Sequence, residues 1–443
     1  MNKMSQSIKL LLAEKPSQAM DIAKIMGLKS RGDGFVITKD DTYVSWSVGH
    51  MIGLKEPDEY DEKWAGRWTF DTLPAIPVAF TYKENSATKK QLKIVGSLIK
   101  KASEVIIATD AGREGELIAR ELLDYFKYKG KVKRFWTSSL TDEAIKDALK
   151  NLKEGHETLP LYEAALARAH GDWLIGKNGS RAATLAAGTG DTFPLGRVKT
   201  AVLYMIVERF EKIKNFEPVS YFELEAVVKT KKGETFKMVH SPDANNRILS
   251  RDKAEELLSK VKGYSGPLSV TKSEDKETPP LPFSLPSLQS EANKVLGIGV
   301  KNVLKIAQVL YDKKIISYPR TDCPYLDPDL LKGLDFTLKG AESLFPKAVA
   351  FLRSKKIIQR PSVFDKSKLT DHHGIVPVGM PTEDLDPQQK QVYELICKRY
   401  FQVLLSDCKF YSTKVVLDAN GVTFKASGKS IIERGWRELS DYF

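Results

Sequence analysis

The sequence has little that would favour a membrane, secreted or zinc-bound protein. It contains only 3 cysteines and no CxxC pair, so neither a zinc knuckle nor a disulfide framework is indicated. It has no run of about 18 apolar residues, the length that a transmembrane helix needs. The apolar stretch at residues 10–13 is too short for the core of a signal peptide. We therefore expect a cytoplasmic protein with no membrane partner.

Other features are missing as well. The chain has no internal repeat, no low-complexity tract and no GxxxxGK[ST] phosphate-binding loop, so we expect no nucleotide cofactor. Its 443 residues are enough for roughly two to four domains with separate cores. Positive charge is present in excess, with 69 Lys and Arg against 57 Asp and Glu and a net charge of +12. That balance favours a polyanionic partner.

The hydrophobic pattern divides the chain into regions of different secondary structure. Residues 8–13 and 104–109 are predicted strands, and an amphipathic helix follows each of them. Strands that alternate with helices predict a mainly parallel sheet, covered on both faces, for roughly the first 150 residues. Residues 157–213 are predicted as almost continuous helix. Short strands follow, then a helical region over 287–314 and strands again over 411–426.

Acidic side chains stand at the ends of the two predicted strands. Glu14 follows the first strand in LLAEKPS, and Asp110 follows the second in IIATDAGREGELIAREL, where Glu114 and Glu116 open a helix. Ligands bind at the carboxyl edge of open α/β sheets, and carboxylates there suit a hard cation. Alternatively, Asp110 caps the helix and Glu114 and Glu116 only favour its dipole. The presence of Glu14 on a neighbouring strand favours the metal site.

The stretch IISYPRTDC, residues 315–323, raises a second question. An apolar run leads directly to Tyr318, and Arg320 and Asp322 follow. A tyrosine after such a run usually belongs to a core, but the polar residues behind it also suit the mouth of a site. These residues alone leave both interpretations open.

Several segments resemble one enzyme family. LLAEKPSQAMDIAKIMG and ATDAGREGELIARE resemble the Toprim fold of type IA DNA topoisomerases, on the topoisomerase III branch. WSVGHMIGLKEPDEYDEKW, ARAHGDWLIGKNGSRAAT and LGRVKTAVLYMIVERF are similar to later motifs, and the family order continues with IISYPRTD and TDHHGIVP. The resemblance covers almost the whole chain, and motifs in this order are more specific than any single one.

The resemblance implies a multidomain α/β, helical and β-rich fold that closes into a type IA topoisomerase toroid. It predicts a Rossmann-like Toprim catalytic domain over residues 1–153, with a short excursion near 50–75. The implied later segments are a partial helical DNA-binding domain (154–215), the first part of a β-rich arch (216–280), the domain carrying the catalytic tyrosine (281–400) and the return strands of the arch (401–443).

The resemblance also implies the chemistry. Tyr318 is the implied nucleophile, which attacks a DNA phosphodiester and gives a 5′-phosphotyrosine and a free 3′-hydroxyl. A free tyrosine has a pKa of about 10 and reacts poorly at neutral pH without help from cations. Lys15, Arg320 and His372 are the implied phosphate contacts. Because the phosphotyrosine stores the energy of the broken bond, resealing needs no ATP.

Further roles at the acidic positions are implied in the same way. Glu14 is the implied proton donor to the leaving 3′-oxygen, and Glu14, Asp110 and Glu114 are the implied Mg²⁺ ligands. The usual Toprim motif is Asp-x-Asp-x-Glu, but Gly112 stands at its middle position. That difference removes one carboxylate and weakens the prediction of a second metal ion.

A further set of positions is implied to follow a single DNA strand. A basic groove with aromatic platforms suits binding that has little sequence preference. We expect a monomer that binds single-stranded or negatively supercoiled DNA. The implied positions are His50, Arg168, Asp172, Lys177, Arg181, Pro194, Leu195, Gly196, Arg197, Val198 and Lys199.

Three classes of function stay open. The first is an ATP-independent topoisomerase, an isomerase that relaxes negative supercoils or decatenates DNA by strand passage. The second is a shorter relative that binds or cleaves single-stranded DNA without full strand passage, since members of the family continue beyond the position of Phe443. The third is a Toprim nuclease or primase-like enzyme, and Tyr318 within YPRTD argues against it.

Overall fold

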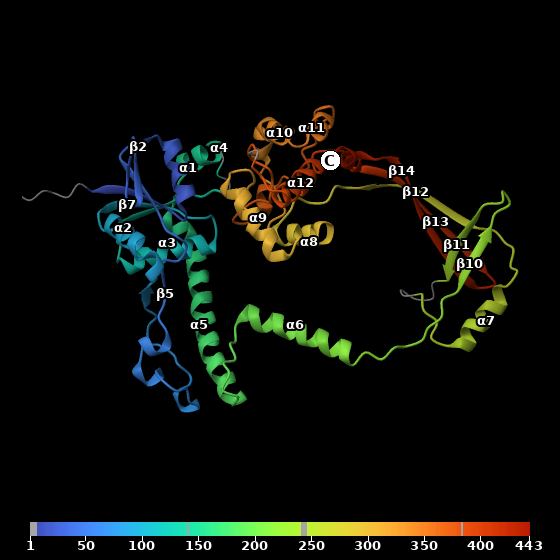
Figure 1. Ribbon diagram of the computed structural model, residues 1–443, viewed down its shortest axis with the longest axis horizontal. Helices are drawn as coiled ribbons and strands as arrows, with labels where there is room; N and C mark the ends of the chain where they lie inside the picture. The colour runs from blue at the N-terminus through green and yellow to red at the C-terminus, as the bar shows by residue number, and fades with distance from the viewer. Residues whose placement is uncertain (1–6, 139, 141, 241–245, 382–383) are drawn as a thin grey trace, which may run out of the picture. The chain divides into compact units, whose positions relative to one another are not determined.

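The chain folds into two compact units (Figure 1). The computed structural model describes residues 7–138, 140, 142–240, 246–381 and 384–443. The first unit comprises Met1–Glu211 and Ser367–His373, and the second comprises Lys212–Lys366 and Gly374–Phe443. A short segment from late in the sequence, Ser367–His373, therefore belongs to the N-terminal unit.

A seven-stranded sheet forms the centre of the first unit. In spatial order its strands are β2 (Leu28–Gly32), β3 (Phe35–Thr38), β4 (Thr42–Trp46), β1 (Ile8–Ala13), β7 (Ala102–Ala108), β8 (Lys131–Arg134) and β9 (Lys153–Glu154). The central strands β4, β1, β7 and β8 pair in parallel. The outer strands join through antiparallel pairs. The prediction of a mainly parallel sheet in this region is confirmed.

Helices cover both faces of this sheet because its central strands are apolar on both sides. The covering helices are α1 (Pro16–Met26), α2 (Lys89–Ile99), α3 (Arg113–Tyr125) and α4 (Asp142–Lys150). Leu10 and Leu12 of β1 pack with α2 and α3. Leu11 and Ala13 point to the opposite face and pack with α1 and α4. Successive side chains of a strand alternate in direction, so β1 contributes to both cores.

Two long helices follow the sheet, α5 (Leu159–Ala187) and α6 (Arg197–Lys214). The prediction of almost continuous helix is wrong over residues 188–196. Gly188 ends α5 in the left-handed conformation, with a φ of 62°, which residues with a Cβ rarely adopt. Among the described residues, no helix is both long and apolar enough to cross a membrane.

Between β4 and α2 the chain makes an excursion away from the sheet. The strands β5 (Ile52–Leu54) and β6 (Tyr82–Glu84) pair with each other, and short 3-10 turns lie between them. The indole Nε1 of Trp173 on α5 donates a hydrogen bond to the carbonyl oxygen of Lys55 at 2.8 Å. This bond ties the excursion to α5.

The helix α6 exposes apolar side chains all around its axis. Leu203, Tyr204, Met205 and Ile206 follow one another in sequence, and each is 58–68% exposed. Consecutive helical residues point about 100° apart, so this apolar surface is not confined to one face. Helices that are apolar all round are usually buried, which makes the exposure of α6 unusual.

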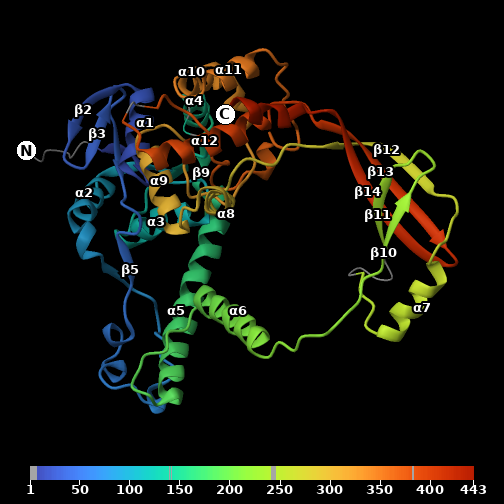
Figure 2. The same ribbon diagram turned by 45° about the vertical axis from the view of Figure 1, so that its right-hand side comes forward.

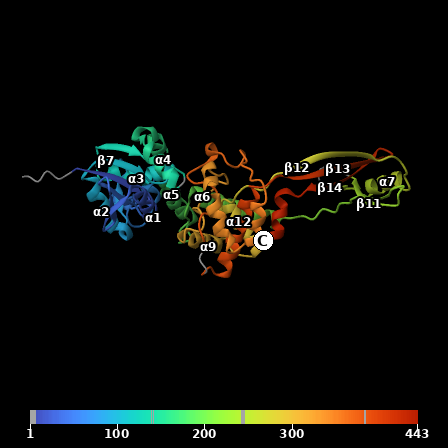
Figure 3. The ribbon, with the colours of Figure 1, turned by 90° about the horizontal axis from the view of Figure 1, so that it is seen from above.

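A five-stranded antiparallel sheet forms one part of the second unit (Figures 2 and 3). Its strands, in spatial order, are β10 (Glu225–Lys229), β11 (Thr235–His240), β14 (Val422–Glu433), β13 (Cys408–Ala419) and β12 (Ser269–Glu277). The helix α7 (Arg251–Val261) contributes Leu257 and Val261 to the apolar cluster beside this sheet. Strands from the start and the end of the second unit are therefore neighbours.

Helices form the other part of the second unit around one large apolar core. They are α8 (Leu285–Leu296), α9 (Val300–Asp312), α10 (Leu334–Glu342), α11 (Pro346–Arg353) and α12 (Pro387–Gln402). The last residues of the chain form a 3-10 helix, Gly435–Tyr442, that buries Leu439 in the same core. The segment after β14 thus packs with the helices and not with the sheet.

Candidate functional site

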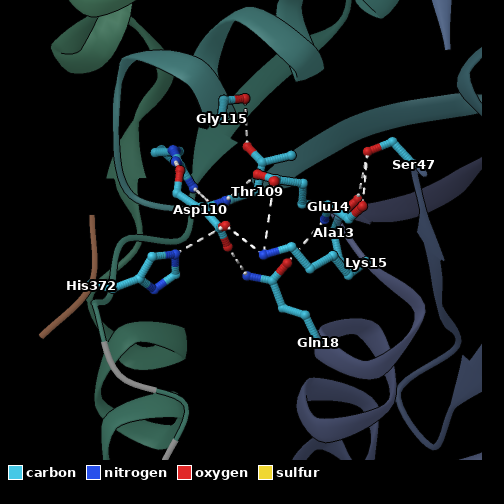
Figure 4. A network of polar contacts seen from close by, with 10 residues as sticks. Ala13, Glu14, Lys15, Gln18, Ser47, Thr109, Asp110, Gly115 and His372 are labelled. Atoms are coloured by element: carbon cyan, nitrogen blue, oxygen red, sulfur yellow. Dashed lines mark hydrogen bonds and ion pairs between the residues drawn. The ribbon is translucent and has the colours of Figure 1, made fainter. Parts of the chain in front are cut away.

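Glu14 and Asp110 lie next to each other at the carboxyl edge of the first sheet (Figure 4). Glu14 directly follows β1, and Asp110 lies just beyond β7. Ala13 and Ala108, the last residues of these two parallel strands, are in register. The Oε2 atom of Glu14 accepts a hydrogen bond from the backbone N–H of Asp110 at 3.1 Å. The pairing of β1 with β7 therefore brings both carboxylates to one place.

Three donors surround the Asp110 carboxylate (Figure 4). The Nζ of Lys15 lies 2.9 Å from Oδ2, and the Nε2 of His372 lies 3.2 Å from the same oxygen. The Nε2 of Gln18 donates to Oδ1 at 3.2 Å, while the Oε1 of Gln18 accepts from the backbone N–H of Glu14 at 3.0 Å. Lys15, Glu14, Asp110 and His372, which the sequence singled out separately, thus form one cluster.

The two carboxyl groups of this cluster have opposite electrostatic environments. Burial raises the pKa of Glu14, the charge of Asp110 adds to this, and Lys15 opposes it. Burial also acts to raise the pKa of Asp110, but the hydrogen bond and charge of His372 and the charge of Lys15 together hold that pKa below its ordinary value. The edge therefore places a carboxyl that resists ionisation beside one that stays ionised.

A buried ion pair supports the backbone at Asp110. The Arg134 guanidinium donates to the carbonyl oxygens of Thr109 at 2.8 Å and Asp110 at 2.7 Å. Its Nε pairs with Glu116, which also accepts from the Nε of Arg120 at 2.7 Å. The side chains of Glu116 and Arg134 are completely buried. Glu116 therefore holds the strand end in position and is more than a residue that favours the helix dipole.

Glu114 is engaged by other partners. One carboxylate oxygen lies 2.8 Å from the Nε2 of His50, and the other accepts from Arg168 at 2.6 Å. The hydrogen bonds to Glu114 and Glu121 raise the pKa of His50 to about 9. The hydrogen bond from His50, followed by the charges of His50 and Arg168, lowers the pKa of Glu114. Within the described ranges, no three His, Cys, Asp or Glu side chains converge to hold a metal ion.

The positions implied to contact DNA on α5 carry their own ion pairs. The Arg197 guanidinium pairs with both oxygens of Asp172, at 2.9 and 3.0 Å, and so links the start of α6 to α5. Lys177 pairs with Glu56 of the excursion. Arg181 is buried, and its Nη1 donates to the carbonyl oxygen of Trp64 at 3.1 Å. Arg181 thus has a structural role in the excursion.

The connection between α5 and α6 contains the remaining implied DNA positions. Pro194 is exposed. The backbone N–H of Leu195 donates to the Oγ of Ser180 at 2.8 Å, and that of Gly196 donates to Thr200 at 3.1 Å. Val198 and Lys199 are exposed on the first turn of α6. Their proposed contact with DNA stays a prediction.

Tyr318 and Arg320 belong to the second unit. Tyr318 is half-buried, directly after the buried residues Ile315, Ile316 and Ser317, and Arg320 is exposed. The backbone N–H of Ser317 donates to the carbonyl oxygen of Val376 at 2.9 Å. The Tyr318 ring meets the ring of Tyr311 edge to face, with centroids 5.3 Å apart. Tyr318 is thus the first side chain of its segment to emerge from the core.

Comparison with known proteins gives a family for the whole chain. A family model described as "Toprim domain" matches residues 9–140, and a model described as "DNA topoisomerase" matches residues 156–442. The chain belongs to the type IA DNA topoisomerases. It is topoisomerase III-like, since DNA topoisomerase 3 of Bacillus licheniformis is 35% identical to it over 441 residues, and that of Bacillus subtilis is 33% identical over 439 residues.

The alignments also show how much of a topoisomerase this chain represents. Each of these two alignments covers 98% of the chain but only 60% and 59% of the respective relatives. The chain therefore spans about 60% of the length of the curated relatives it matches. The structure of full-length topoisomerase I from Thermotoga maritima matches with a TM-score of 0.62 and 23% identity, over 97% of this chain and 67% of that one. That match supports the fold.

The donor set of this topoisomerase III-like chain fits the Mg²⁺ that Toprim domains typically bind. Mg²⁺ prefers carboxylate oxygens, and Glu14 and Asp110 offer them side by side. The cationic Nζ of Lys15 already lies 2.9 Å from Asp110 and 4.0 Å from Glu14, so the pair attracts positive charge. Glu14, Asp110 and Glu114 all lie within the Toprim match, and their role as metal ligands stays a prediction.

Sequence reasoning missed the residues that position the topoisomerase site. Gln18 was assigned no role, although it contacts both Glu14 and Asp110. Arg134 was also missed, although an arginine at the end of a predicted buried strand indicates a buried carboxylate partner. That partner, Glu116, stands in the motif that the analysis treated as a helix start.

Proposed function

We propose that this chain is an ATP-independent DNA topoisomerase that cleaves one DNA strand, passes another strand through the break and reseals it. The observation that carries the proposal is the convergence of Lys15 and His372 on Asp110, beside Glu14. Cationic donors and carboxylates at one sheet edge suit phosphoryl transfer, which depends mainly on positioning and charge stabilisation. Relaxation of negative supercoils and decatenation are the topological outcomes that we propose.

In the proposed cleavage step, the Tyr318 oxygen attacks the phosphorus of the scissile phosphodiester. The bond from phosphorus to the 3′-oxygen breaks as the bond to tyrosine forms. The tyrosine proton is released, and the departing 3′-oxygen takes a proton from Glu14. Resealing is the reverse, with the 3′-hydroxyl attacking the phosphotyrosine, so no external energy source is required.

Positive side chains would stabilise the charged phosphate during both steps. Lys15, Arg320 and His372 are the proposed contacts. In the DNA-free chain, Asp110 holds Lys15 and His372 through hydrogen bonds, and a phosphate can replace the carboxylate because it offers the same charge-assisted acceptors. Mg²⁺, held by Glu14, Asp110 and Glu114, would supply further positive charge near the phosphate.

The proposed substrate is single-stranded or negatively supercoiled DNA. The candidate contacts on α5 and α6, such as Arg168, Lys177 and Arg197, pair with carboxylates at the surface. Such exposed pairs are weak, so DNA phosphates can displace the carboxylates at little cost. This supports a protein that follows the DNA backbone and does not read base sequence.

The test is relaxation of negatively supercoiled plasmid in buffer with Mg²⁺ and without ATP. We expect a ladder of topoisomers that changes linking number in single steps, together with nicked DNA that migrates with protein after denaturation. Addition of a chelator should stop the relaxation. Neither relaxation nor a protein–DNA adduct in the presence of Mg²⁺ would contradict the proposal.

One observation favours a second candidate function. The exposed apolar surface of α6 and the coverage of only about 60% of the relatives suit a chain that cleaves and reseals single-stranded DNA without completing strand passage. Oligonucleotide cleavage with Mg²⁺ but no plasmid relaxation would select this alternative.

A further inference from the structure

Gly112 occupies the middle position of the segment Asp110–x–Gly112–x–Glu114, where a third carboxylate would complete the usual Toprim pattern. Its backbone is extended, with φ of −167° and ψ of 179°, a conformation that any residue can adopt. The backbone therefore does not require glycine at this position. What excludes a side chain is space, because a Cβ added at Gly112 would collide with the carboxylate of Asp371.

Asp371 reaches this place from a distant part of the sequence. It lies in the segment Ser367–His373, which belongs to the first unit although its neighbours on both sides belong to the second. The next residue, His372, bonds to Asp110 at 3.2 Å and so fixes the segment at the sheet edge. The carboxylate of Asp371 thus fills the space in which a side chain of residue 112 would begin.

The surroundings of Asp371 argue against a purely structural role. None of its carboxylate oxygens accepts a hydrogen bond or forms an ion pair within the part of the chain that the structure describes. Asp110 and Glu114 act on it as like charges, and Arg113 and His372 as opposite ones. A carboxylate held beside two others, with no donor of its own, is stabilised by a bound cation.

We propose that Asp371 is a metal-binding residue that supplies, from outside the Toprim sequence motif, the carboxylate that Gly112 lacks. It would act with Asp110 and Glu114 on a hard divalent cation. The inference rests on the proposed function, which places Mg²⁺ at this edge. It differs in naming a ligand that follows from the contact between Gly112 and Asp371 and from no motif position.

The proposal predicts that a carboxylate can be moved from one position to the other. Asp371→Asn keeps the shape of the side chain and removes its charge, so affinity for the cation should fall. Asp371→Ala should have the same effect and also open the space beside Gly112. Adding Gly112→Asp to Asp371→Ala should then restore the affinity, because the carboxylate returns on the other side of the same contact.

The experiment is titration of the DNA-free protein with Mn²⁺, followed by electron paramagnetic resonance of the free ion. Wild type should bind, and Asp371→Asn and Asp371→Ala should bind at least about tenfold more weakly. Asp142→Asn, which removes an exposed carboxylate from α4 of the same unit, is the matched control and should bind like wild type. The double variant Gly112→Asp with Asp371→Ala should recover most of the affinity.

The outcomes separate the inference from the function on which it rests. If wild type and Asp371→Asn bind Mn²⁺ equally while Asp110→Asn does not bind, the role of Asp371 is overturned and the metal edge remains. If wild type binds no Mn²⁺, both the inference and the proposed metal are overturned. Far-UV circular dichroism shows whether each variant is folded, and the double variant keeps the proposal open to refutation if Asp371→Ala alone is unstable.

Discussion

Glu116 and Arg134 form an ion pair with no exposed side-chain surface on either residue. The same guanidinium binds the carbonyl oxygens of Thr109 and Asp110. The pair therefore connects the first turn of α3 to the ends of β7 and β8. A buried charge is tolerated only when its partner is present, which makes this pair a sensitive point of the first unit.

Replacing Glu116 by alanine should destabilise the first unit by about 3–5 kcal/mol, because Arg134 would keep its charge in the interior without a carboxylate. Urea unfolding followed by circular dichroism measures the loss. The matched control is Glu154→Ala, which removes the partner of Lys133 in a surface pair on the neighbouring strands, and its effect should be small. Equal effects of the two variants would show that burial of the Glu116 pair does not matter.

Tyr318→Phe should abolish the covalent adduct with single-stranded DNA, because the variant loses only the oxygen that would attack phosphorus. Binding of the oligonucleotide should stay close to that of wild type. Denaturing gels of labelled oligonucleotide report the adduct. Tyr311→Phe is the control, since its ring lies against that of Tyr318 and should not be needed for the bond. An adduct that persists in Tyr318→Phe would place the nucleophile elsewhere.

The double variant Asp110→Asn with Glu114→Gln should lose Mg²⁺-dependent resealing and keep more of its cleavage activity. Lys15 and Arg320 supply positive charge for cleavage in the proposed mechanism, whereas resealing depends more on the metal. Titration of Mg²⁺ in a resealing assay with a pre-cleaved oligonucleotide tests this. Resealing at the wild-type rate would mean that these carboxylates serve only the start of α3.

Affinity for oligo-dT should fall steeply with salt, with a log–log slope of about −0.7 for each phosphate contacted. A blunt duplex should bind more weakly. Arg197→Ala should reduce the slope by about 0.7, as expected for the loss of one phosphate contact. Filter binding across a salt series measures all three quantities, and Lys150→Ala on α4 is the surface control. A flat salt dependence would contradict binding through the DNA backbone.

The sequence predicted those parts of the site that depend on local pattern and strand order. Glu14 and Asp110 end apolar strands, and parallel strands bring their carboxyl ends to one edge, so their proximity could be expected. The pair of Glu116 and Arg134 could not, because each charge taken alone suits the surface of a helix or strand. The contact of Gly112 with Asp371 depends on the return of a distant segment, which no periodicity reports.

Membership of Ser367–His373 in the first unit has a practical consequence for dissecting the molecule. The chain passes between its two units at three points, after Glu211, after Lys366 and after His373. One proteolytic cut after Glu211 would leave the units joined by the other two connections. A fragment ending at Glu211 would lack His372 and Asp371, so the Asp110 carboxyl would lose a hydrogen bond and Gly112 its cover. Activity measured on such a fragment would describe an edge that the intact chain does not present.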